Sequence, residues 1–238
     1  MERREFLKVC ASFASLTFLS PALLKESFAS QSNEFKRYEK ALLVKNDGTP
    51  LKPEDIEVGK QYIFFYPYIS TPAFLINLGK EVNPVEVSLS NGSKYLWPGG
   101  VGPQKSIIAF CAICPHQLLH PTPDYSLINY YPPDKVSGVV KRGNVIQCCG
   151  HLSVYDPEKG GVVISGPAEY PLLTIVLSYE DGKLYAVGTL GKEFFTEFFD
   201  TFRDELRNLY KSLAEAKKMV DKAVVLELEK YTKQLISC

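Results

Sequence analysis

The 238-residue sequence predicts a mainly β, antiparallel fold that is followed by a C-terminal α-helical extension. Short runs of branched and aromatic residues recur from about residue 39 onward, and turn clusters such as Asn46-Asp47-Gly48 separate them. The chain also contains 14 Tyr, 14 Phe, 16 Gly and 16 Pro, a composition that favours a loop-rich β protein over a helical one. From Gly191 onward the apolar residues follow a helical period instead.

Residues 1–30 have the features of an export signal. Arg3 and Arg4 precede a mostly apolar run at residues 9–24, and Ser27-Phe28-Ala29 is a candidate cleavage site. The arginine pair resembles the twin-arginine consensus. The apolar run of about 16 residues is shorter than the roughly 20 that span a bilayer, so a cleaved signal and a retained anchor both stay open. We expect an exported protein, in the periplasm or on the outer face of the cytoplasmic membrane.

Residues 31–190 are expected to form one β domain. The β-like runs are residues 41–45, 62–66, 73–77, 85–89, 107–110, 136–140, 162–165, 172–178 and 184–188. Basic and acidic side chains are balanced at 27 each, so no basic field indicates a nucleic-acid partner.

Two short stretches in the middle of this domain carry metal-binding side chains. Cys114 and His116 lie in the first, and Cys148 and His151 lie in the second. The order Cys, His, Cys, His differs from that of a zinc finger, in which both Cys precede both His. It fits two facing loops that each give one Cys to one iron and one His to the other. A Cys3His zinc site that includes Cys111, and ordinary buried thiols or disulfides, are the alternatives.

The pattern resembles the Rieske signature C-x-H…C-x-x-H. Ser153 and Tyr155 match the residues that donate hydrogen bonds to the cluster sulfurs in that family, and Gly166-Pro167 resembles its proline loop. Residues 99–110 and 156–161 also resemble the small subunit of arsenite oxidase, and the cytochrome bc Rieske subunit is similar. The resemblance implies an antiparallel Rieske-type β-sandwich with inserted cluster-binding loops, the cluster-binding part covering about residues 105–170.

The resemblance further implies one Rieske [2Fe–2S] cluster with Cys114, His116, Cys148 and His151 as its metal ligands. Imidazole ligands and hydrogen-bond donors near the sulfurs raise the reduction potential. We therefore expect a high-potential electron-transfer subunit of an exported oxidoreductase, not a complete enzyme. Its expected partners are a molybdopterin subunit or a cytochrome b, together with a cytochrome c. A stand-alone periplasmic electron carrier is the alternative.

The sequence departs from the family where the family's disulfide cysteines stand. Gln117-Leu118-Leu119 follows the first His, and Gly150 precedes the second. We expect a relocated disulfide between Cys111 and Cys149, which an oxidising compartment permits. His120 is expected to be a loop residue with a backbone partner.

Two further segments have alternative interpretations. The spacer at residues 117–147 is either a loop packed on the domain or a docking lip beside the cluster. Residues 191–238 are expected to form a helical tail, with a heptad seam from Phe195 to Ala223. That seam either packs on its own β domain or associates with another helix through residues 195–223.

Overall fold

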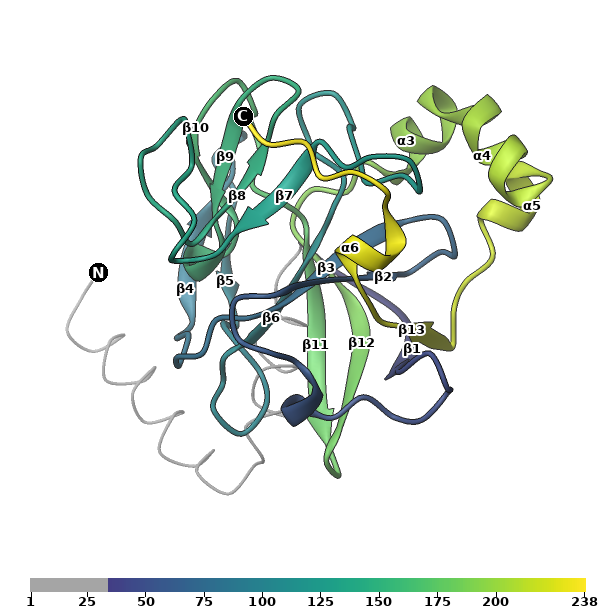
Figure 1. The fold of residues 1–238 in the computed structure, drawn as a ribbon, viewed down its shortest axis with the longest axis horizontal. Coiled ribbons are helices and arrows are strands. Elements are labelled where there is room, and N and C mark those ends of the chain that lie inside the picture. The colour runs from purple at the N-terminus through teal and green to yellow at the C-terminus, as the bar shows by residue number, and fades with distance from the viewer. Residues whose placement is uncertain (1–33) are drawn as a thin grey trace.

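The computed structural model describes residues 34–238, so the predicted signal at residues 1–30 lies outside the described residues. The main element is an eight-stranded sheet with the order β13-β1-β12-β11-β6-β3-β2-β14 (Figure 1). Its strands are β1 (Phe35–Val44), β2 (Gln61–Phe65), β3 (Pro72–Asn77), β6 (Ile107–Cys111), β11 (Thr174–Glu180), β12 (Lys183–Leu190), β13 (Lys222–Val224) and β14 (Leu226–Glu227). All strand pairs except β1–β13 are antiparallel, so the predicted mainly β, antiparallel fold is confirmed.

One extended segment near the C-terminus joins the two edges of this sheet. β13 pairs with β1 at residues 42–44, and β14 pairs with β2 at Tyr62 and Ile63. Between them, the amide of Val225 donates to the carbonyl of Val44 at 2.8 Å. Because residues 222–227 bond to both edge strands, the sheet curves round and closes into a barrel.

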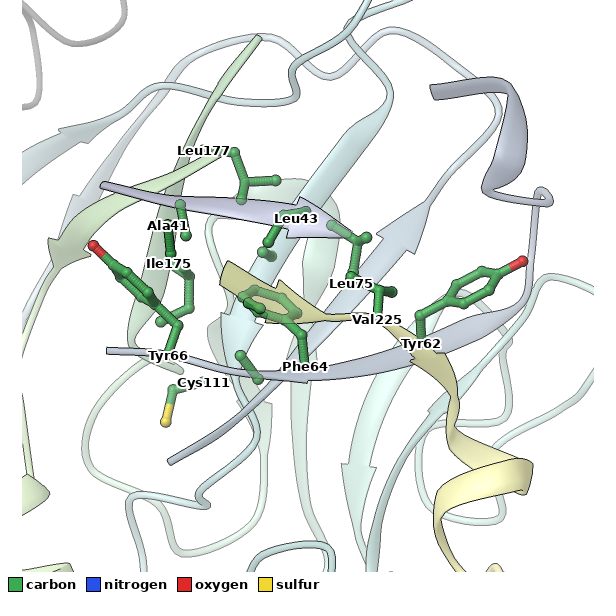
Figure 2. Close-up of a cluster of buried hydrophobic side chains, with 14 of the residues drawn as sticks. Ala41, Leu43, Tyr62, Phe64, Tyr66, Leu75, Cys111, Ile175, Leu177 and Val225 are labelled. Atoms are coloured by element: carbon green, nitrogen blue, oxygen red, sulfur yellow. The ribbon is translucent and has the colours of Figure 1, made fainter. Parts of the chain in front are cut away.

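The period of two along each strand divides its side chains between two cores. On β6, the side chains of Ile107, Ala109 and Cys111 belong to the core inside the barrel, whereas those of Ile108 and Phe110 belong to a second core outside it. Figure 2 shows the inner core, where Cys111 lies with aromatic and aliphatic side chains from β1, β2, β11 and the closing segment. Both faces of β6 are buried, which explains its continuous apolar sequence.

Two smaller sheets pack on the outer core. The four-stranded sheet has the order β10-β9-β8-β7, and β4 pairs with β5 in a hairpin. Trp97 of β5 stacks on Phe110 of β6 with ring centroids 5.9 Å apart. The strands are β4 (Val85–Ser88), β5 (Lys94–Trp97), β7 (Ile128–Tyr131), β8 (Val145–Cys148), β9 (Ser153–Asp156) and β10 (Val162–Ser165); η1 (Pro53–Asp55) and η2 (Pro157–Lys159) are short 3₁₀ turns.

The predicted C-terminal helical extension is present, but its helices are short and interrupted. Residues 191–238 form the helices α3 (Phe195–Thr201), α4 (Arg203–Tyr210), α5 (Leu213–Ala216) and α6 (Leu228–Tyr231), but they also contain β13 and β14. The regular helix stops at Lys211, whose φ of 69° places it in the left-handed region. The heptad period therefore does not describe one continuous helix.

The tail's apolar seam is covered by the protein itself. Phe195, Phe198 and Phe199 are buried in the inner core, and Phe195 and Phe199 pack edge-on against Tyr68. These contacts favour packing on the β domain over association with another helix through residues 195–223, although Leu209 of the seam is 48% exposed. No helix within residues 34–238 has the length and apolar character needed to cross a membrane.

The spacer at residues 117–147 also packs on the protein's own chain. It supplies β7, which pairs with β8 from Ile128 to Tyr131. Its outer side is covered by the C-terminal segment, where the amide of Ser126 donates to the carbonyl of Gln234, and the amide of Ile236 donates to the carbonyl of Ser126, both at 2.9 Å. Figure 1 shows the C-terminus ending beside this smaller sheet.

Candidate metal centre

Two loops present the candidate ligands, and each loop begins at the end of a buried strand. The first follows β6 and closes on itself: the Cys114 amide donates to the Leu119 carbonyl at 2.9 Å, and the Leu118 amide donates to the Cys114 carbonyl at 2.8 Å. The second connects β8 to β9, which pair at Cys148 and Ser153. The strand ends therefore fix where both loops start.

The two loops pack directly against each other. A Cβ atom added to Gly150 would lie 2.1 Å from Cδ1 of Leu119, so a larger residue here would require the Leu119 side chain to move. The rings of His116 and His151 meet at the same junction, with centroids 4.7 Å apart and an interplanar angle of 78°.

The two cysteines lie on the inner side of this junction. Cys114 and Cys148 are 2% and 1% exposed and belong to the outer core. A hydrogen bond from the Cys148 thiol lowers the pKa of Cys114 to about 6 against the opposing effect of burial. The same bond raises the pKa of Cys148, because the donor must keep its proton. One thiol of the pair therefore ionises readily, which prepares it to bind a metal.

The histidines lie on the outer side. His151 is exposed and His116 is partly exposed. Nδ1 of His116 is nevertheless buried and has no hydrogen-bond partner. Leaving such an atom unpaired costs about 1–3 kcal/mol, so this nitrogen is a candidate to bind a metal. The four predicted ligand residues are thus brought together, with sulfurs inside and imidazoles at the surface.

No family model matches the chain. The chain is 29% identical over 136 residues to the iodate reductase subunit IdrB of Denitromonas iodatirespirans, a match that covers 57% of this chain and 58% of that protein. It is 28% identical over 138 residues to IdrB of Pseudomonas sp. (strain SCT), covering 57% and 56%. The chain therefore matches little more than half the length of these relatives.

Among solved structures, the chain is similar to the soluble domain of Rieske protein II (soxF) from Sulfolobus acidocaldarius. The sequence identity is 26%, the TM-score is 0.47, and the match covers 64% of this chain and 78% of that one. The C-x-H and C-x-x-H loops pack against each other. The sequence matches are consistent with the resemblance of these loops to the Rieske signature. In its two ligand loops the chain resembles Rieske proteins.

The donor set of these two loops fits a [2Fe–2S] cluster. Such a cluster takes two Cys on one iron and two His on the other, so neither iron needs three side chains. The unpartnered Nδ1 of His116 and the paired thiols of Cys114 and Cys148 supply ligand atoms of the required kinds.

Tyr155 lies beside the thiol of Cys114, and Ser153 is the strand neighbour of Cys148 in the β8–β9 pair. The Tyr155 hydroxyl lies 3.1 Å from Sγ of Cys114, and burial raises its pKa, so it keeps the proton that it can donate. Ser153 Oγ accepts a hydrogen bond from the amide of Ala168 at 3.2 Å, which ties the proline loop to β9. Gly166 in that loop has φ +89°, and an added Cβ would lie 2.5 Å from Cα of Ser153.

The expected disulfide between Cys111 and Cys149 is wrong. Cys149 is bonded to Cys238, and Cys111 is a free thiol. Cys111 belongs to the inner core, where Figure 2 shows it, whereas the cluster-loop cysteines Cys114 and Cys148 belong to the outer core. The sequence does not indicate a pairing with Cys238, because it lies 89 positions from Cys149 in a segment predicted to be helical. Once Cys114 and Cys148 are assigned as ligands, the remaining cysteines are the candidates for a disulfide.

The alternative Cys3His zinc site is wrong for the same reason. It requires Cys111 together with Cys114, Cys148 and His151 around one ion. Cys111 lies in the inner core and the other two thiols lie in the outer core, on opposite faces of the large sheet. Burial also raises the pKa of Cys111 to about 12, which keeps this thiol protonated and unreactive.

Replacing Cys238 with Ser should lower the free energy of unfolding by about 2–4 kcal/mol, the usual contribution of a disulfide that closes a long loop. The two cysteines are separated by 89 positions, so the unfolded chain gains much freedom when the bond is absent. Thermal unfolding with and without reductant measures the effect, and the variant should no longer respond to reductant. Mass mapping of the non-reduced protein should find Cys149 linked to Cys238; a link to Cys111 would contradict the structure.

Proposed function

We propose that this protein is the Rieske electron-transfer subunit of an exported oxidoreductase complex. In this proposal Cys114 and Cys148 hold one iron of a [2Fe–2S] cluster, and His116 and His151 hold the other. The observation that carries it is the meeting of these four side chains where two loops pack together, with the thiols buried and the imidazoles at the surface.

When bound, the cluster supplies reversible one-electron transfer. The chain contributes two neutral imidazoles and a buried tyrosine donor, all of which favour the reduced state and so a high potential. The exposed ring of His151 places the metal side of the site at the surface, where a partner can approach. The sulfur side is enclosed by the outer core, which excludes water from the thiolates.

The relatives support a role within a larger assembly. Both are named as subunits of iodate reductase, so each belongs to a multi-subunit reductase. Together with the local resemblance to the arsenite oxidase small subunit, this favours a molybdopterin subunit over a cytochrome b as the partner. A cytochrome c is the second redox partner in this proposal. The twin-arginine motif at Arg3 and Arg4 supports export of the folded protein.

Two measurements on the full-length protein test the proposal. Metal and sulfide analysis should give two iron atoms and two acid-labile sulfides per chain, and the reduced protein should give a Rieske electron paramagnetic resonance spectrum. Affinity purification from the native host should then recover a molybdopterin subunit. Zinc or no metal would overturn the cluster, recovery of a cytochrome b would overturn the choice of partner, and a cluster protein without a partner would be a stand-alone carrier.

Tyr155→Phe should lower the reduction potential while the cluster stays in place. The variant removes the hydroxyl beside Sγ of Cys114 and little else. A hydrogen bond to a charged group is worth about 1.5–3 kcal/mol, which corresponds to roughly 60–130 mV for a one-electron couple. Protein-film voltammetry measures the shift. Tyr125→Phe, at a tyrosine that is 46% exposed, is the matched control and should leave the potential unchanged.

A further inference from the structure

The first ligand loop contains a backbone conformation that needs support. Leu118 has φ +60°, in the left-handed region that residues other than glycine rarely adopt. Its amide and the carbonyl of Leu119 make the two hydrogen bonds that close the loop onto Cys114. The turn that carries His116 therefore depends on Leu118 staying in a conformation that costs about 1–2 kcal/mol.

One side chain holds the carbonyl of this residue. Nδ1 of His120 lies 3.1 Å from the oxygen of Leu118, and Nε2 lies 2.8 Å from Oε1 of Glu205 on α4. The His120 side chain is 7% exposed, and its ring packs edge-on against Phe198 and Phe202, with centroid separations of 4.9 and 4.6 Å. The first ligand loop is thus joined to the C-terminal helices through a single buried imidazole.

The partners of this imidazole are both acceptors. A peptide carbonyl faces one nitrogen and a carboxylate faces the other, so both bonds form together only when both nitrogens carry a proton. The ring therefore links the first ligand loop to α4 through both of its nitrogens. Aromatic rings on two sides and the Leu118 carbonyl on a third keep its orientation fixed.

We propose that His120, held by Glu205, is a positioning residue that fixes the first ligand loop, and with it His116, for cluster binding. The inference rests on the proposed function, because the loop is taken to hold the cluster. It adds that the C-terminal helices α3 and α4 belong to the support of the metal centre. His120 itself is not a ligand, because both of its nitrogens are already engaged.

Three variants of the full-length protein separate the contributions. His120→Phe keeps an aromatic ring between Phe198 and Phe202 but removes both hydrogen bonds. Glu205→Leu removes the carboxylate. Glu205→Gln keeps a polar side chain, whose amide can bond to Nε2 of a neutral imidazole while Nδ1 donates to the Leu118 carbonyl. Asp204→Asn, at a side chain that is 92% exposed on the same helix, is the matched control.

The readouts are the rate at which an iron chelator bleaches the protein, the width of its paramagnetic resonance lines, and hydrogen exchange of the amides at residues 114–120. His120→Phe and Glu205→Leu should each speed bleaching by roughly tenfold, the factor that corresponds to about 1.4 kcal/mol. They should also broaden the lines and raise exchange in that loop. The double variant should be no worse than either single one, because both break the same unit. Glu205→Gln and Asp204→Asn should behave as wild type.

Unchanged bleaching, line width and loop exchange in His120→Phe and Glu205→Leu, with only a lower melting temperature, would reduce the pair to an ordinary structural contact and overturn the inference. A wild-type protein without a Rieske spectrum would instead overturn the proposed function. Loop exchange can also be measured on protein without iron, so the same variants would still decide whether His120 and Glu205 hold the loop.

Discussion

A chain that ends at Gly191 should neither fold nor bind iron. The removed residues include side chains that are at most 6% exposed: Phe195, Phe198, Phe199, Leu206, Val225 and Leu228. Burying one such side chain contributes about 1.5–3 kcal/mol, so these six contribute about 9–18 kcal/mol. That matches or exceeds the total stability of about 5–15 kcal/mol that a typical domain has. The truncation also opens the barrel between β1 and β2.

Circular dichroism, soluble yield and iron content measure this loss. The matched control removes only residues 237 and 238, which deletes the disulfide but keeps the barrel-closing segment at residues 222–227. That control should stay folded and keep its cluster. A soluble protein that ends at Gly191 and shows a normal Rieske spectrum would mean that barrel closure is dispensable.

Replacing any one of the four proposed ligands with alanine should abolish the Rieske paramagnetic resonance signal. In the proposed arrangement each iron would have two protein ligands, and the loss of one would leave it open to water and to release. His151→Ala is the sharpest case, because its exposed side chain contributes little to packing and the fold should survive. Paramagnetic resonance spectroscopy and iron analysis of the purified variants measure the cluster, and circular dichroism measures the fold.

Cys111→Ala is the matched control for the cysteine variants. It removes a buried thiol three residues before Cys114, but that thiol faces the barrel interior. The variant should therefore keep the full signal, with some loss of stability from the small cavity. Loss of the signal in Cys111→Ala, or its persistence in all four ligand variants, would require a different set of ligands.

The strand pattern and the ligand loops could be predicted because local sequence determines them. Alternation on β6 and the short spacing within each Cys–His loop are properties of a few consecutive residues. The path of residues 211–238 could not be predicted in this way. Lys211 has a left-handed backbone conformation, which a lysine in the sequence does not predict. β13 pairs with β1, which is about 180 positions earlier in the sequence.

The same limit applies to the disulfide and to His120. Cys111 and Cys149 are both near ligands in sequence, and only the side of β6 on which Cys111 lies excludes their pairing. His120 was expected to bond to the backbone, and it does so at Leu118, but its second partner, Glu205, comes from a helix 85 positions away. Contacts of this range depend on the packing of whole elements.

The closing segment also orders the events of biosynthesis. Residues 222–227 bond to both β1 and β2, so the barrel is incomplete until these late residues have been made. The N-terminal strands leave the ribosome early, but β1 and β2 cannot pair with the closing segment until residues 222–227 have been synthesised. The outer core that encloses Cys114 and Cys148 rests on this barrel. We infer that the metal centre is assembled only after translation has passed residue 227.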